Sequence, residues 1–190
     1  MEAEGSAFNA DTHLEQMFLD LRAEFEITAV IETGTYHGDT TKWLVNNFET
    51  VHTIEVNESY QRIAKLNVAI RTNLTYWTGS SAEVLRDVIR VCKGEKLLIF
   101  LDAHWWANPV LRELDQIAEA GIKPVLVIHD FKNPEDLTMG YDVYPEQKIV
   151  YEWDWIKDRV EKIYGVDGYT KYYNKEATGA RRGCLFIIPK

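Results

Sequence analysis

The sequence predicts an α/β domain in which a mostly parallel sheet is covered by helices on both faces. Short apolar runs, such as LLIFL and VLVI, alternate along the chain with amphipathic stretches. These runs show no polar alternation, which is typical of strands that are buried on both faces. Alternating strands and helices indicate a parallel sheet between two helical layers, and therefore a three-layer sandwich.

The expected elements follow from the spacing of apolar residues. A helix is expected over residues 11–25, where Leu14, Phe18 and Leu21 recur at helical spacing after Asp11 or Thr12 as N-cap. Five strands are then expected at residues 29–31, 51–56, 74–77, 96–101 and 124–128, with helices near 38–48, 57–70, 81–91 and 107–120 between them.

The last third of the chain has a different pattern. A helix is expected over about 147–163, followed by strands at 169–174 and 184–188. The connection between these two strands is short, so they must run antiparallel. Trp153 and Trp155 lie two residues apart in the expected helix and cannot share a face, so core packing is expected for one of them.

Composition and length indicate one soluble globular domain. The chain has 190 residues, of which 46% are hydrophobic and 27% charged, and no repeat or linker divides it. We therefore expect a single domain over 1–190, with residues 1–27 as an N-terminal helical extension. No run approaches the roughly 18 apolar residues of a membrane helix. The acidic N-terminus does not resemble a signal peptide, which favours a cytoplasmic protein.

Charge and cysteine content limit the function further. The net charge of −9 disfavours nucleic acid as a partner, and the densest basic spot, Arg181 with Arg182, is thin for a nucleic-acid groove. Cys92 and Cys184 both lie in apolar stretches, where we expect them to pack in the core.

Polar or glycine-rich segments follow all five expected parallel strands. Ligands bind beyond the carboxyl ends of strands in such sheets, so these segments are the candidate site. In chain order they are ETGTYHG, IEVNE, TGSSAE, LDAHWW and VIHDF. Their convergence at one edge of the sheet indicates function more strongly than any one of them alone.

The first segment has the pattern E-x-G-x-x-x-G, formed by Glu32, Gly34 and Gly38, with Thr35 inside it. It lacks both the G-x-G-x-x-G of dinucleotide sites and the G-K-[ST] of phosphate loops, and Asp39 would oppose a phosphate. The loop suits a ligand that carries an amine and a cation. Glu32 could hold the amine directly or through water, unless the glycines only serve the turn. A side chain at Gly34 is expected to block the ligand and to affect folding less.

These segments resemble those of class I S-adenosylmethionine-dependent methyltransferases over roughly residues 28–190. Glu32, Gly34 and Gly38 match the first motif of that family, and Glu55 falls where the family places the acid that binds both ribose hydroxyls. The segment GSSAEVL resembles the third motif, with Ser80 and Ser81 where an acid often contacts the adenine amino group.

The resemblance implies a Rossmann-like three-layer sandwich with a mostly parallel seven-stranded sheet and a C-terminal antiparallel hairpin. It also implies S-adenosyl-L-methionine as the cofactor and methyl transfer to a small-molecule acceptor, at a hydroxyl oxygen. The role of the N-terminal helix stays open, as lid or as dimer contact, and so does a homodimer.

The fourth and fifth strand ends carry the candidate chemical groups Asp102, His104, His129 and Asp130. In metal-dependent O-methyltransferases of this family, aspartates after these strands hold Mg²⁺, which would assign Asp102 and Asp130 as ligands. The family follows the second aspartate with asparagine, whereas this chain has Phe131. A transition metal, or His104 as a base with an orienting partner, are alternatives. So are plain structural roles: helix capping by Asp102 and a backbone hydrogen bond of His129.

Two further features bear on the acceptor. Trp105 and Trp106 could form a wall for a flat or sugar-like substrate, and the polar segment 131–147 is a candidate covering loop. Two other functions remain open at this stage. One is a metal-dependent nucleotide-sugar transferase that uses D-A-H as a metal motif; the other is a cofactor-binding domain without transfer activity.

Overall fold

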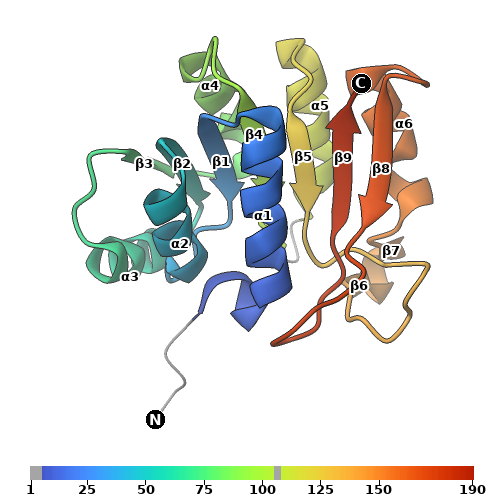
Figure 1. Cartoon of the computed structure of the whole chain (residues 1–190), viewed down its shortest axis with the longest axis horizontal. Helices are drawn as coiled ribbons and strands as arrows, with labels where there is room; N and C mark the ends of the chain where they lie inside the picture. Colours follow the sequence, from blue (N-terminus) through green and yellow to red (C-terminus); the bar gives the residue numbers. More distant parts are fainter. Residues whose placement is uncertain (1–5, 105–107) are drawn as a thin grey trace.

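The computed structural model describes residues 6–104 and 108–190, and its centre is a seven-stranded sheet (Figure 1). The strand order is β3-β2-β1-β4-β5-β9-β8. Strands β1 to β5 pair in parallel, and β9 runs antiparallel to both β5 and β8. The predicted parallel sheet with a C-terminal antiparallel hairpin is therefore confirmed. The strands are β1 Ala29–Thr33, β2 Thr50–Glu55, β3 Leu74–Thr78, β4 Leu97–Leu101, β5 Val125–Ile128, β8 Tyr169–Tyr173 and β9 Leu185–Pro189.

Helices lie on both faces of this sheet. They are α1 Thr12–Phe25, α2 Asp39–Asn47, α3 Glu58–Val68, α4 Ser81–Val91, α5 Val110–Ala120 and α6 Trp153–Tyr164, with a short 3-10 turn at Ala7–Ala10. Helix α1 begins where predicted, because the Asp11 carboxylate accepts the backbone N–H groups of His13 and Leu14. None of the helices in the described ranges is long and apolar enough to cross a membrane.

The alternating sides of β4 explain its continuous apolar sequence. Leu97, Ile99 and Leu101 pack in a cluster with residues of α4, α5 and α6. Leu98 and Phe100 pack in a second cluster, with residues of α1 and α2. In Figure 1, α1 lies in front of the sheet while α4 and α5 lie behind it. Both faces of the strand are thus buried, as a three-layer arrangement requires.

The N-terminal residues contribute directly to one of these layers. The rings of Phe8 and Phe18 lie 4.7 Å apart, and those of Phe18 and Phe100 lie 5.2 Å apart. Phe8, Phe18 and Phe100 are each at most 2% exposed. The helical extension expected over 1–27 therefore covers the front face of the central strands over its described part, where it forms core and not a lid.

The expected helix over 147–163 is wrong at its start, because α6 begins only at Trp153. Residues before it form a small antiparallel pair, β6 (Val143–Tyr144) with β7 (Ile149–Val150), joined by the 3-10 turn Pro145–Gln147. Pro145 and the β-branched pair at 149–150 favour this turn and strand over a helix. Both tryptophans are partly buried against the core. Trp155 stacks on Tyr151, and the ring centroids of Trp153 and Tyr169 lie 6.0 Å apart.

Two other boundaries matter for the site. Strand β1 continues to Thr33, two residues beyond its expected end, which places Glu32 inside the sheet. Helix α5 begins at Val110, with Pro109 at the N-cap, and its expected start at 107 lies outside the described residues. Cys92 and Cys184 are free and buried, as expected.

Gly34 is required by the fold itself, which corrects the expectation that a side chain there would mainly block the ligand. Its φ is +87°, and a Cβ would lie 2.6 Å from the backbone oxygen of Asp102. Gly94 has a similar φ of +95° but has open space around it. The two glycines therefore separate the cost of a left-handed backbone from the cost of a collision.

We predict that Gly94→Ala lowers the free energy of unfolding by about 1–2 kcal/mol, the cost of a left-handed backbone. Gly34→Ala should cost at least about 2 kcal/mol more, because the backbone of Asp102 cannot move without disturbing β4. Urea denaturation of both variants measures the difference. Equal losses would show that the close approach to Asp102 is not needed.

Candidate active site

Sheet register brings the predicted strand ends together. Thr33 pairs with Leu101, and Leu101 with Ile128, so Asp102 and His129 follow directly on neighbouring strands. The backbone N–H of Asp102 donates to Thr33 O at 3.1 Å, and that of His129 donates to Leu101 O at 3.1 Å. The carboxyl ends of β1, β4 and β5 thus form one continuous edge.

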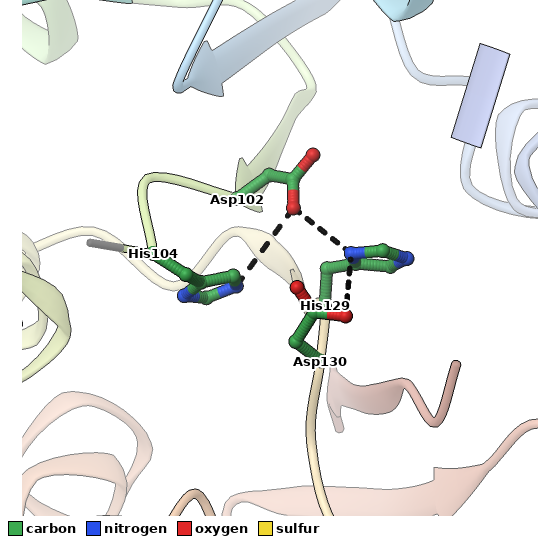
Figure 2. Close-up of side chains that lie close together, drawn as sticks. All are labelled: Asp102, His104, His129 and Asp130. Carbon is green, nitrogen blue, oxygen red and sulfur yellow. Dashed lines mark ion pairs between the residues drawn. The ribbon is translucent and has the colours of Figure 1, made fainter. Parts of the chain in front are cut away.

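At this edge Asp102, His104, His129 and Asp130 point toward one another (Figure 2). Asp102 is central, since its Oδ1 lies 2.9 Å from Nδ1 of His129 and 3.8 Å from Nε2 of His104. Oδ1 of Asp130 lies 3.3 Å from the same Nδ1 of His129. One donor atom from each of the four residues lies within 4.8 Å of the others. The helix-capping and backbone-bonding roles do not describe this geometry.

The two histidines differ in their electrostatics. Burial alone would lower the pKa of His129, but the facing carboxylates of Asp102 and Asp130 raise it well above its ordinary value. Burial lowers the pKa of His104, although the same carboxylates oppose the shift. His129 is thus the charged partner and His104 the neutral one. Among the described residues, neither buried ring nitrogen of His104 has a hydrogen-bond partner, and the ring centroids of His104 and Tyr151 lie 4.8 Å apart with the rings nearly perpendicular.

Asp130 has a second cationic partner, Arg182, whose guanidinium also pairs with Asp142. Burial would raise the pKa of Asp130, but His129, His104 and Arg182 lower it below its ordinary value. Asp142 in turn accepts a hydrogen bond from the Tyr144 hydroxyl at 2.9 Å. Arg181 lies 3.8 Å from Asp136. The basic pair 181–182 is therefore matched by acids of the segment 131–147.

The donor set suits a metal ion. Two carboxylates and two imidazoles within one small volume provide oxygen and nitrogen ligands, and the buried unpaired nitrogens of His104 lack another partner. Mixed ligands of this kind fit Mn²⁺, Fe²⁺ or Zn²⁺ at least as well as Mg²⁺, which prefers oxygen. Arg182 at Asp130 and the charge on His129 oppose a cation, so binding would displace the proton of His129.

Glu32 lies inside the sheet and does not reach the surface. Its Oε2 accepts hydrogen bonds from Thr41 at 2.5 Å and Thr53 at 2.6 Å, whereas its buried Oε1 has no hydrogen-bond partner in the described part of the chain. Burial raises its pKa to about 8. Thr35 is also buried, with its hydroxyl 2.5 Å from that of Thr53. In this arrangement Glu32 and Thr35 support the loop from below.

Backbone N–H groups hold both carboxyl oxygens of Glu55 at the end of β2. Its Oε2 accepts the backbone N–H of Tyr36, and its Oε1 that of Asn57, both at 2.8 Å. Each oxygen retains a lone pair for a further donor. Gly38 begins α2 with a φ of +86°, and a Cβ there would lie 2.9 Å from Ala64 of α3. Gly38 therefore packs α2 against α3 beside Glu55.

The third segment begins α4. Ser80 is the N-cap residue, but its side chain makes no capping hydrogen bond, and Ser81 is buried. The backbone N–H of Gly79 donates to Glu55 O at 3.0 Å. The β3–α4 connection is thus fastened directly to the strand end that carries Glu55.

Sequence reasoning did not assign Arg182, Asp142 or Tyr151 to the site. Asp142 and Tyr151 lie in connections with no motif, and Arg182 could be read only as part of a basic pair. No local signal pairs Arg182 with an acid 52 residues away. Trp105 and Trp106, the expected substrate wall, lie outside the described residues.

A cavity of about 780 Å³ lies at the opposite end of the strands, near Leu97 and Val125. On its rim Arg86 pairs with Glu119, and Lys96 pairs with Glu26. The cavity is remote from the four-residue cluster and contributes no group to it.

No protein-family model matches this chain, and no curated protein matches its sequence. Solved structures do match its fold. A Staphylococcus aureus protein, provisionally named a caffeoyl-CoA O-methyltransferase, aligns with 95% of this chain and 85% of its own, at 18% identity and a TM-score of 0.67.

Two further matches are complexes with a cofactor or its product. The O-methyltransferase TomG from Streptomyces achromogenes, in complex with SAM, aligns with 93% of this chain and 79% of its own, at 15% identity and a TM-score of 0.63. An O-methyltransferase from Bacillus cereus, in complex with SAH, aligns with 100% of this chain and 84% of its own, at 17% identity and a TM-score of 0.63. The chain thus has the Rossmann-like fold of these methyltransferases.

The raised pKa of Glu32 predicts how stability depends on pH. A carboxyl whose folded pKa is about 8 favours the folded state while protonated, so its contribution is complete below about pH 4.5 and is lost as pH rises through 8. Between those two pH values the free energy of unfolding falls by up to about 1.4 kcal/mol per pH unit. Glu32→Gln should flatten the fall in free energy of unfolding between pH 5 and pH 8.5, measured by urea denaturation. Exposed Glu24→Gln is the control, and an unchanged slope in Glu32→Gln would contradict the assignment.

Proposed function

We propose that this protein transfers a methyl group from S-adenosylmethionine to a hydroxyl oxygen of a small-molecule acceptor. The observation that carries the proposal is the position of the four-residue cluster at the same sheet edge as Glu55. A diol-binding carboxylate and a group of acids and imidazoles are what the two ends of such a reaction need. The shared fold with O-methyltransferases supports the assignment.

The residues at the first two strand ends each have a role in holding the cofactor. Glu55 accepts the two ribose hydroxyls with its remaining lone pairs. Gly34 lets the loop turn close over Asp102, which leaves room for the methionine part along the strand ends. Glu32 acts on the amine through the loop or a water molecule, because its own carboxyl is buried.

The transfer step requires an acceptor oxygen in line with the methyl carbon. A carbon–oxygen bond forms as the carbon–sulfur bond breaks, and the hydroxyl proton must leave. The neutral imidazole of His104 can take that proton, and Asp102, 3.8 Å away, stabilises the imidazolium that results. His129, held between Asp102 and Asp130, sets the position of both carboxylates.

A divalent cation is the alternative means of activating the hydroxyl. Asp102 and Asp130 would hold it, with the two histidines completing the ligand set. A bound cation lowers the pKa of a coordinated hydroxyl and so replaces a base. His104 is then a ligand, and the two roles of His104 predict different responses to metal.

The first test concerns the cofactor. Glu55→Ala should weaken S-adenosylmethionine binding by about 10²-fold or more, because two hydrogen bonds to a charged acceptor are lost and each costs about 1.5–3 kcal/mol. Isothermal calorimetry measures the affinity. The matched control is Glu58→Ala, which removes an exposed acid three residues after Glu55 that pairs with Arg62. Parental affinity in a folded Glu55→Ala protein would rule out this ribose site.

The second test separates base from metal. With His104 as base, His104→Ala should slow turnover about 10²-fold with cofactor binding within a few-fold, and chelation should have little effect. With a metal, chelation and Asp102→Ala should both abolish turnover, and one of Mg²⁺, Mn²⁺ or Zn²⁺ should restore the chelated parent. Single-turnover rates over a panel of hydroxyl acceptors provide the readout. Cofactor binding without turnover of any acceptor would favour a binding domain.

A further inference from the structure

Glu113 is a buried acid that the fold alone does not explain. It lies in the first turn of α5, it is 0% exposed, and within residues 6–104 and 108–190 no donor meets hydrogen-bond geometry with either of its carboxyl oxygens. Burying a carboxyl without a partner is costly, and an apolar side chain of similar size would remove that cost. A group retained against stability is a candidate for function.

Its surroundings point to the first turn of α4. Gln116, one turn further along α5, shares the face of Glu113 and is also buried. Its Nε2 donates to Ser81 O at 2.9 Å, and its Oε1 accepts the backbone N–H of Arg86 at 3.0 Å. Helix α5 therefore holds the backbone of Ser81 with one buried polar residue and places a second beside the same residue.

The hydroxyls of Ser81 and Thr33 are the polar side chains that act on Glu113. Burial raises the pKa of Glu113 to about 7, and these two hydroxyls lower it in part. The Oγ1 of Thr33 also accepts the backbone N–H of Asp102 at 3.3 Å. Ser81 has no such second contact through its hydroxyl in the described structure, so a rotation about its Cα–Cβ bond can direct that hydroxyl to Glu113.

Ser81 also lies next to the proposed ribose site. It comes two residues after Gly79, whose N–H donates to Glu55 O. A nucleoside whose ribose binds Glu55 therefore has its base over the β3–α4 connection. This connection contains serines and no acid before Glu83, although an exocyclic amino group needs an acceptor.

We propose that Glu113 is a positioning residue for recognition of the adenine amino group through Ser81. This proposal rests on the proposed function. Glu113 accepts a hydrogen bond from the Ser81 hydroxyl, which leaves the lone pairs of Ser81 Oγ for the amino group. A hydroxyl that donates to a carboxyl is also a better acceptor. Glu113 thus acts on the amino group indirectly, through the Ser81 hydroxyl, where the family often places an acid in direct contact.

The proposal predicts selectivity between two purine edges. Adenine presents a donor amino group, whereas hypoxanthine presents an acceptor carbonyl at the same position. A Ser81 oxygen fixed as acceptor attracts the first and repels the second. A serine without Glu113 can rotate its hydroxyl to suit either base, so selectivity should fall.

The experiment compares S-adenosylhomocysteine with S-inosylhomocysteine by calorimetry. The variants are Glu113→Leu, Ser81→Ala and the double variant, with Glu119→Leu on the exposed side of α5 as control. We expect the parent to prefer the adenosyl ligand by about 10-fold or more and each single variant to lose most of that preference. The double variant should be no worse than either single one, because both act on one contact.

Stability separates positioning from packing. Glu113→Leu should unfold at the same temperature as the parent or higher, since it removes a fully buried carboxyl whose desolvation a hydroxyl hydrogen bond offsets only in part. Glu113→Gln, which keeps an acceptor oxygen, should retain part of the selectivity. If Glu113→Leu lowers the unfolding temperature and weakens the affinity for both ligands equally, Glu113 has a structural role and the proposal is overturned. A parental ratio of affinities in Glu113→Leu would overturn it as well. A parent that binds neither ligand would instead refute the proposed function.

Discussion

The close approach of β1 and β4 at their carboxyl ends is the constraint on which the rest of the site depends. Gly34 turns the chain directly against the backbone of Asp102, with no room for a Cβ. The N–H of Asp102 is held by Thr33 O, so the side chain of Asp102 leaves the sheet at a fixed point. Parallel pairing of β5 then places His129 beside it. Any shift of β1 against β4 would move Asp102 away from its imidazole partners.

The buried carboxyls around this point differ in the partners that offset their burial. Glu32 and Glu113 are fully buried with raised pKa values of about 8 and 7, because neutral hydroxyl groups offset their burial only in part. Asp130 is also mostly buried, but Arg182 and His129 keep it ionised. Groups whose surroundings move their pKa values apart are typical of functional sites. The negative charge at this edge is thus reduced in two ways: the raised pKa values of Glu32 and Glu113 favour their protonated forms, and Arg182 and His129 neutralise Asp130.

The same cations join the late connections to the site. Arg182 crosses Gly140, where a Cβ would lie 2.8 Å from its Nη1, to reach Asp142. The connection between β8 and β9 also contacts the N-terminal segment, since the N–H of Thr178 donates to Asp11 Oδ1 at 3.1 Å. The segment expected to cover the acceptor is therefore anchored by Arg182 at Asp130, so a change at either residue should affect both loop and cluster.

The sequence by itself determined the seven strands of the main sheet, their order along the chain and the polar groups at the ends of the parallel strands. Local apolar patterns are sufficient for this, because a strand buried on both faces must be apolar throughout, as LLIFL in β4 is. The short 174–184 connection was likewise sufficient to predict the antiparallel hairpin. Asp102 and His129 could be placed side by side from the general geometry of parallel sheets alone.

Only the tertiary structure decided what surrounds those groups. Glu32 pairs with Thr53 across 21 residues, Arg182 with Asp130 across 52, and Gly34 meets the backbone of Asp102. The helix expected from residue 147 gave way to a strand pair whose partner lies at 143–144. Contacts of this kind depend on register and on which connection crosses which strand end. Burial and charge partners therefore arise from the assembled sheet, and spacing along the chain carries no record of them.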